Sequence, residues 1–223
     1  MRNFRTEGII IKRRNFSEAD RLLTVMTRNY GKIQVKAAGV RKITSRRSAH
    51  IELLNYTILH LYKGNTFSIL TEAKMIDDFY SIKKDFSKIG LAYHACELVD
   101  GLCPENQEND KVFSLLQRTL SDLSQDDVTY LPESTSSEID DYTIGTFGIE
   151  VSEPLETRTA ISDVSHSTKN QSSLLHRFEI ALLSELGYLD RKDIEQKHVD
   201  LHEMIEDILE RKLKSHSIFA KLQ

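Results

Sequence analysis

The spacing of apolar residues changes about a third of the way along the chain. Before residue 78, apolar and β-branched residues occur in short runs or at every second position, which is typical of half-buried β-strands. From residue 86 onward they recur every three or four positions, as on the buried face of an amphipathic helix. We therefore predict an α+β chain, with a β-domain at residues 1–78 and an α-helical domain at residues 79–223.

The first domain contains five segments with strand character. They are residues 6–14, 21–27, 32–38, 51–62 and 66–73. In the third segment Ile33, Val35 and Ala37 alternate with polar residues, as in a half-buried antiparallel strand. Gly31, just before it, suits the left-handed position of a hairpin turn. Five short strands fit a small closed barrel better than a sandwich, which usually needs about seven.

Four helices are predicted in the second domain, at residues 86–103, 110–123, 173–187 and 200–214. Asp110 is the expected N-cap of the second helix, and Gly187 the expected glycine at the end of the third. Residues 124–172 hold 10 Asp/Glu against two Lys/Arg and are rich in Ser and Thr. We predict an acidic, largely flexible insertion there, which is either a solvated spacer or a competitor for a basic surface.

Membrane spans and signal peptides are not visible in the sequence. No apolar run approaches the roughly 20 residues that cross a bilayer, and the N-terminus lacks a signal-peptide pattern. The expected location is therefore the cytoplasm. Cys96 and Cys103 lie seven positions apart on one predicted helix face, so we expect two small core residues and no disulfide.

Common sequence signatures of catalysis are missing. The chain has no glycine-rich phosphate loop, no nucleophile elbow and no zinc-protease motif. His198 and His202 lie four positions apart and could share a metal, but a third ligand is not evident. We therefore predict a protein that is not an enzyme and that has no cofactor and no metal.

Charge is divided unevenly along the chain. The net charge is −4, yet residues 1–77 hold 15 Lys/Arg against 6 Asp/Glu. Such a division suggests that the first part meets a polyanion, although basic and acidic halves can also simply attract each other. A basic strand face continued by a basic loop would follow a phosphodiester backbone. The residues that we predict to bind nucleic acid are Arg13, Arg14, Lys32, Lys36, Arg41, Lys42, Arg46 and Arg47. Phe4, Phe16 and Tyr30 either stack on bases or belong to the barrel core.

Several motifs resemble the family of the bacterial recombination mediator RecO. In the first domain the matching positions are Glu7-Gly8, Glu18-Ala19-Asp20-Arg21, Gly31-Lys32 and Gly39-Val40-Arg41-Lys42. Further matches are Tyr62-Lys63-Gly64, Leu70-Thr71-Glu72-Ala73, Ala95-Cys96-Glu97-Leu98-Val99-Asp100 and the segment 178–188. The resemblance covers about residues 3–123 and 173–220.

Membership of this family implies a five-stranded OB-fold β-barrel, which is an oligonucleotide-binding fold, followed by an α-helical domain. It also implies DNA repair and recombination at the bacterial nucleoid, through binding of single- and double-stranded DNA, strand annealing and, together with RecR, loading of RecA. The implied partners are RecR, single-strand binding protein and, indirectly, the RecA filament. The family's basic residues correspond here to Lys36, Arg41, Lys42, Arg46 and Arg47, whereas Arg13, Arg14 and Lys32 are added on charge alone.

Two features depart from the family pattern. Many relatives carry a four-cysteine zinc module after the third helix, but no cysteine follows Gly187-Tyr188 here, so we expect no zinc. The acidic segment 124–172 is the second departure. The alternative function is an OB-fold interaction adaptor that binds an acidic partner, such as the tail of single-strand binding protein, instead of DNA.

Overall fold

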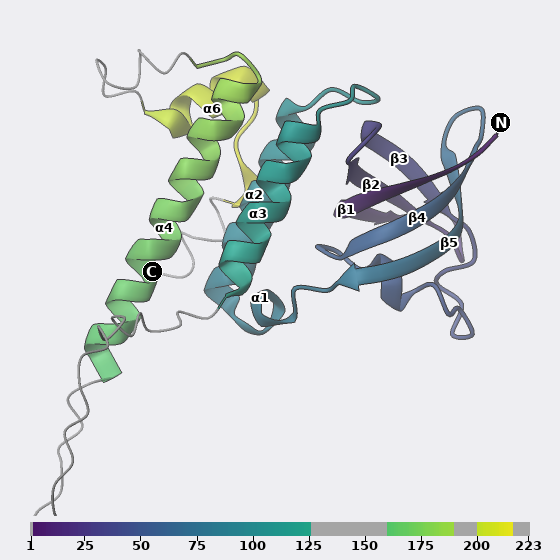
Figure 1. Ribbon diagram of the computed structural model, residues 1–223, viewed down its shortest axis with the longest axis horizontal. Helices are drawn as coiled ribbons and strands as arrows, with labels where there is room; N and C mark the ends of the chain where they lie inside the picture. Colours follow the sequence, from purple (N-terminus) through teal and green to yellow (C-terminus); the bar gives the residue numbers. More distant parts are fainter. Residues whose placement is uncertain (1, 126–159, 190–199, 216–223) are drawn as a thin grey trace, which may run out of the picture.

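The computed structural model describes residues 2–125, 160–189 and 200–215. Its strands are β1 (Asn3–Asn15), β2 (Arg21–Thr27), β3 (Gly31–Ala37), β4 (Tyr56–Lys63) and β5 (Ser68–Asp77). Its helices are α1 (Tyr80–Lys84), α2 (Phe86–Leu102), α3 (Asp110–Ser124), α4 (Ala160–Glu185) and α6 (Leu201–Leu209), with a 3-10 helix η1 (Ala49–Ile51). The strands gather at one end of the molecule, and α2 and α3 lie between them and α4 (Figure 1). Among these described helices, none is both long and apolar enough to cross a membrane.

The five strands close into a barrel in the order β1-β2-β3-β5-β4. β1 completes the ring because it pairs antiparallel with both β2 and β4, and a bulge between Ile10 and Lys12 bends it. β3 and β5 are joined in parallel, with Lys36 opposite Ile69. The predicted α+β fold, a five-stranded OB-fold barrel followed by helices, is confirmed.

The β2–β3 hairpin follows the predicted pattern. Gly31 adopts a φ of 63° at the turn, where residues other than glycine are strained. Ile33, Val35 and Ala37 point into the barrel and belong to the hydrophobic cluster that fills it. The polar residues between them therefore lie on the outer surface of β3.

The fourth strand is shorter than predicted. It begins at Tyr56, five residues later than expected, because η1 and a turn precede it. In this turn Leu54 has a left-handed φ of 71°, and the Asn55 side chain donates a hydrogen bond to the Ala49 carbonyl at 2.9 Å. Leu54 and Ile51 are nevertheless buried, so an apolar run could not distinguish this compact turn from a strand.

The helical domain shows one wrong cap. α3 begins at Asp110, but its N-cap is Asn109, whose side chain accepts a hydrogen bond from the Val112 amide at 3.0 Å. Asn109 has an extended φ of −152°, whereas the predicted cap Asp110 already belongs to the first helical turn. Asn and Asp cap helices about equally well, so the sequence alone did not choose between neighbours.

The third predicted helix begins earlier than expected. α4 runs from Ala160, so residues 160–172 of the predicted flexible insertion form a helix, while its residues 126–159 lie outside the described residues. Residues 160–172 are mostly polar, so the sequence showed no apolar stripe that could indicate this helix. The end of α4 is confirmed, because Gly187 has a φ of 80° and the Tyr188 amide donates to the Leu183 carbonyl at 2.9 Å. α6 begins at Leu201, one residue after the predicted start, with Asp200 as its N-cap, and it already ends at Leu209.

The two domains share a hydrophobic core. Ile9, Ile11 and Met26, on the outside of the barrel, belong to the same cluster as Leu98 of α2 and Phe113 of α3. A second cluster fills the barrel itself. The helices therefore cover one side of the barrel, and the loops at its other side point away from them (Figure 1).

Candidate nucleic-acid interface

The loop that follows β3, which we call the basic loop (residues 38–48), is fixed at its base to the β1–β2 loop. The Gly39 amide donates a hydrogen bond to the Asp20 carboxylate at 2.8 Å, and the Arg41 amide donates to the Ala19 carbonyl at 2.9 Å. The Gly39 amide, together with a neighbouring lysine, holds the pKa of Asp20 below its usual value. Asp20 is therefore ionised at neutral pH and keeps the two loops together.

Two arginines of the basic loop bind backbone carbonyls. The Arg41 guanidinium donates to the carbonyls of Ser17 at 3.1 Å and Glu18 at 2.9 Å. The Arg47 guanidinium donates to the carbonyls of Ala38 and Leu70, each at 2.8 Å. Carbonyls satisfy these donors without neutralising the charge, so both side chains stabilise the loop and still contribute positive potential.

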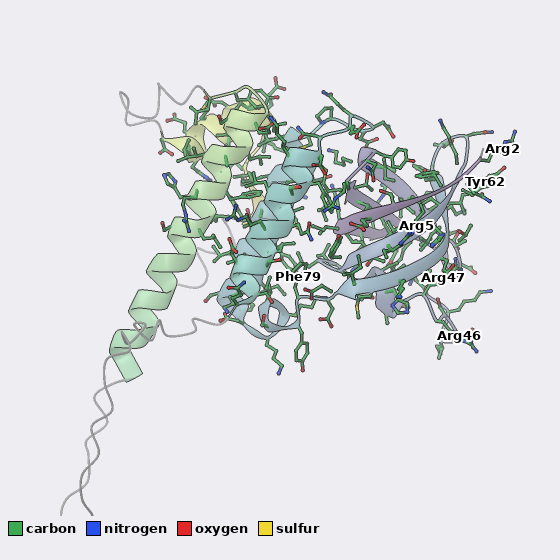
Figure 2. All side chains as sticks on the ribbon, in the orientation of Figure 1. Arg2, Arg5, Arg46, Arg47, Tyr62 and Phe79 are labelled. Carbon is green, nitrogen blue, oxygen red and sulfur yellow. The ribbon has the colours of Figure 1, made fainter. Side chains whose placement is uncertain are left out.

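Three of the predicted cations are exposed and free. The side chains of Lys42, Arg46 and Arg14 make no hydrogen bond or ion pair with any residue that the structure describes. Arg46 projects from the barrel on the side remote from the helices (Figure 2). These three side chains have the mobility and the unsatisfied donors that phosphate contacts need.

Two predicted residues are engaged elsewhere. Lys32 is only 6% exposed, and its ammonium donates a hydrogen bond to the backbone carbonyl of Asp100 in α2. Arg13 forms an ion pair with Glu52, which also binds Arg21 at 2.9 Å. Charge alone had suggested both residues, but Lys32 belongs to the domain junction and the Arg13 guanidinium is engaged by Glu52. The structure therefore separates them from the free cations.

Lys36 joins the basic loop to a pair of aromatic rings. Its ammonium lies 3.1 Å from the Asp20 carboxylate and 5.3 Å from the centre of the Phe16 ring. Phe16, from the β1–β2 loop, packs edge-on against Phe67 next to β5, with ring centres 5.8 Å apart. We call Phe16, Phe67 and Lys36 the aromatic platform. Its rings come from the β1–β2 and β4–β5 loops, the two loops with which OB-folds bind oligonucleotides, and Lys36 comes from β3.

Sequence reasoning missed Phe67 and left the role of Phe16 open. Phe16 is 36% exposed, so it is not core. The other two aromatic candidates, Phe4 and Tyr30, pack on each other with ring centres 4.7 Å apart, and Phe4 also packs against the barrel core. The signal for Phe67 was its position in a polar turn just before β5, where an aromatic residue has little core to fill.

A further cation lies at the end of the barrel farthest from the helices. Arg2 donates a hydrogen bond to the hydroxyl of Tyr62 at 3.0 Å, and both side chains are labelled at this end in Figure 2. The sequence placed Arg2 before the first strand and gave no reason to single it out. It adds a positive charge at this end of the barrel.

Metal and nucleophile chemistry finds little support among the described side chains. Within those residues no group of three His, Cys, Asp or Glu side chains is placed to hold a metal ion. His202 pairs with Glu206 at 3.5 Å, and its predicted partner His198 lies outside the described residues. Cys96 and Cys103 are buried free thiols, and burial raises their pKa values to about 12 and about 11. Neither thiol is therefore ionised at neutral pH.

Comparison with protein families finds a match in each of the two domains. Residues 1–79 match the family model described as "Recombination protein O N terminal". Residues 83–138 match the model described as "Recombination protein O C terminal". The chain belongs to the RecO family. All eight cations predicted to bind nucleic acid lie in the part that matches the N-terminal RecO model.

Individual RecO proteins show the same similarity. A "DNA repair protein RecO" of Roseiflexus sp. is 45% identical over 123 residues, which are 55% of this chain and 43% of that protein. The proteins of the same name from Dehalococcoides mccartyi and Symbiobacterium thermophilum are 37% and 32% identical, over 54% and 52% of this chain. The matched parts cover 48% and 46% of those two proteins. The similarity to these RecO proteins thus spans less than half the length of each.

Proposed function

We propose that this RecO-family chain is a mediator of DNA repair and recombination that catalyses no reaction. It binds DNA through the side of its barrel that the helices leave uncovered. One observation carries the proposal: the aromatic platform adjoins a firmly held basic loop. Phe16 and Phe67 offer ring faces and edges for unpaired bases, and the Lys36 ammonium lies over the Phe16 ring. Lys42, Arg46 and Arg14 supply free positive charge for the backbone.

This combination favours binding that does not depend on base sequence. Phosphate contacts give affinity without reading bases, and every base has a face that can stack. A surface of this kind holds a single strand while leaving the base edges accessible to a complementary strand. Strand annealing is therefore the activity that we propose for the barrel, and duplex DNA would bind through its phosphates alone.

We propose that the helical domain contacts the protein partners implied by the family, namely RecR, single-strand binding protein and the RecA filament. The support is the family membership together with the geometry of the domains. The helices pack on the side of the barrel opposite to the basic loop, so a protein bound there leaves the proposed DNA surface accessible (Figure 1).

The salt dependence of single-strand binding tests the DNA surface. The affinity of a labelled oligonucleotide is measured by fluorescence anisotropy over a range of salt concentrations, for the wild type and for a variant with Arg14→Ala, Lys42→Ala and Arg46→Ala. Each lost phosphate contact lowers the slope of log affinity against log salt by about 0.7, so the triple variant should lose about 2. A matched control replaces three exposed cations of the helical domain, Lys111, Arg118 and Arg177, by Ala.

The two triple variants separate the possible outcomes. A shallower slope for the barrel variant alone supports the proposed surface. If the slope of the barrel variant equalled that of the control variant, the phosphate contacts would lie elsewhere. Tight binding to an acidic peptide, with no binding to naked oligonucleotide, would support the adaptor function in its place.

A further inference from the structure

Ile43, at the tip of the basic loop, is the most exposed apolar side chain among the described residues. Its relative exposure is 105%, whereas the other exposed large hydrophobic residues range from 36% to 65%. Each of those rests partly against the protein, but Ile43 touches almost nothing. A single exposed apolar residue is common on protein surfaces, so its meaning depends on what surrounds it.

The loop holds this side chain in a defined place. Both ends of the loop are attached to the barrel, by Gly39 and Arg41 at one end and by Arg47 at the other. The tip between these attachments is short. Because Ile43 is β-branched, its side chain is also stiff about the first torsion. A fixed loop with a stiff apolar tip loses little entropy when it is inserted into a partner.

The neighbours of Ile43 indicate what that partner is. Lys42 precedes it and Arg46 follows it closely, and both are exposed cations without a partner among the described residues. An apolar side chain between two free cations matches the chemistry of nucleic acid, in which a base stack runs between phosphate backbones. DNA-binding proteins insert Ile, Leu, Phe or Met between bases in this way and unstack them.

The position of Ile43 relative to the aromatic platform indicates which form of DNA the tip would contact. Arg41, two residues before Ile43, binds the carbonyl of Ser17, which is next to Phe16 in the chain. The Arg41 amide also donates to the Ala19 carbonyl at 2.9 Å, and two residues span at most about 7 Å, so the tip lies close to the β1–β2 loop that carries Phe16. A strand that is held on the platform therefore reaches the tip within a few nucleotides.

We propose that Ile43 is a wedge that inserts at a junction between single-stranded and duplex DNA. The single strand lies on the aromatic platform, the duplex begins at the tip, and Lys42 and Arg46 hold the phosphates on either side. Burying one isoleucine does not offset the unstacking of a closed base step, so insertion needs a step that is already open on one side. This inference rests on the proposed function, because it requires that the barrel binds DNA.

The test uses the full chain and a forked DNA that carries 2-aminopurine in the first base pair of the duplex. The fluorescence of 2-aminopurine rises when it unstacks, and anisotropy of a separate label on the same fork reports binding. We expect the wild type to bind the fork and to raise the 2-aminopurine signal. Ile43→Ala should lose most of that rise without losing affinity for a single strand. Ile43→Leu should retain the rise, and Thr44→Ala, an exposed neighbour in the same loop, serves as the control.

The readouts distinguish failure of the wedge from failure of the proposed function. Binding of the fork without a 2-aminopurine signal, or a signal that Ile43→Ala preserves, overturns the wedge and leaves DNA binding intact. An equal loss in Thr44→Ala also overturns the wedge, because it would assign the effect to the loop as a whole. Absence of binding to both the fork and the single strand overturns the proposed function and the wedge together.

Discussion

Lys32 of β3 and Asp100 of α2 join the barrel to the helical domain. The Lys32 ammonium donates to the backbone carbonyl of Asp100 and lies 3.9 Å from its carboxylate, which Lys12 also binds at 2.6 Å. Four residues further along β3, Lys36 contacts Phe16 instead. The outer side of one strand therefore serves two purposes, with its first half in the domain junction and its second half in the proposed DNA surface.

Replacing Lys32 should affect stability and not DNA binding. Lys32→Met leaves the Asp100 carbonyl without its donor, and an unsatisfied buried group costs about 1–3 kcal/mol of unfolding free energy. Lys12→Met is the control, because the Lys12 side chain is 59% exposed and such a pair contributes at most about 1 kcal/mol. Urea unfolding measures both variants, and anisotropy checks that the folded Lys32→Met protein keeps its affinity for DNA. Equal costs for the two variants would contradict the role of Lys32 in the junction.

The barrel was predictable because its pattern is local. Alternation in β3 placed Ile33, Val35 and Ala37 inside, and Gly31 marked the hairpin turn before them, as the structure confirms. The sequence could not predict which half of the outer side of β3 is covered by the helices. That depends on the contact of Lys32 with Asp100, which lies 68 residues further along the chain. Periodicity indicates which side of a strand faces outward, but not what covers it.

The aromatic platform shows the same limit more strongly. Phe16 and Phe67 come from two loops that are 51 positions apart, and only the parallel pairing of β3 with β5 brings them together. Neither loop carries a periodic pattern. The basic loop was recognisable from its charge, but the attachments of Arg41 and Arg47 to backbone carbonyls depend on the closed barrel.

The two left-handed glycines of the barrel should respond differently to substitution. A Cβ at Gly31 would lie 1.8 Å from the Gln107 carbonyl oxygen, so Gly31→Ala has to displace backbone at the domain junction. At Gly39 a Cβ would meet nothing within 4 Å. Gly39→Ala should lower the free energy of unfolding by about 1–2 kcal/mol, which is the cost of a left-handed alanine. Gly31→Ala should lower it by clearly more. Thermal unfolding of both variants measures the difference, and similar melting temperatures would contradict the close approach.

Removing the ring of Phe67 should weaken single-strand binding without changing its salt dependence. Phe67→Leu keeps an apolar side chain but loses the stacking face. Loss of one base–aromatic stack weakens binding by about 1–3 kcal/mol. The slope against salt should stay constant, because no phosphate contact is lost. Tyr30→Leu is the matched control, since Tyr30 is a 42% exposed aromatic residue that pairs with Phe4 outside the platform. Anisotropy with a single-stranded oligonucleotide measures both variants, and an equal loss in both would remove the platform from the binding site.

The carboxylate of Glu97 should make the attachment of the C-terminal segment sensitive to acid. Burial alone would raise the pKa of Glu97, but hydrogen bonds from the Lys214 and Ser215 amides, at 3.0 and 2.9 Å, bring it below its usual value overall. A folded-state pKa below the unfolded one means that the ionised carboxylate stabilises the fold. This stabilisation is complete above the unfolded value and is lost as the pH falls through the folded value.

Glu97→Gln tests this sign directly, because glutamine keeps the shape of the side chain but carries no charge. At about pH 7 the variant should unfold at a lower temperature than the wild type, and the gap should close as the pH falls below the usual titration range of a glutamate. Glu108→Gln, which changes an exposed carboxylate before α3, should follow the wild-type curve at every pH. If the gap between the wild type and Glu97→Gln stayed constant with pH, the stabilisation would come from the shape of the side chain and not from its charge. Only a difference in melting temperature that narrows in acid would show that the ionised form of Glu97 stabilises the hydrogen bonds from Lys214 and Ser215.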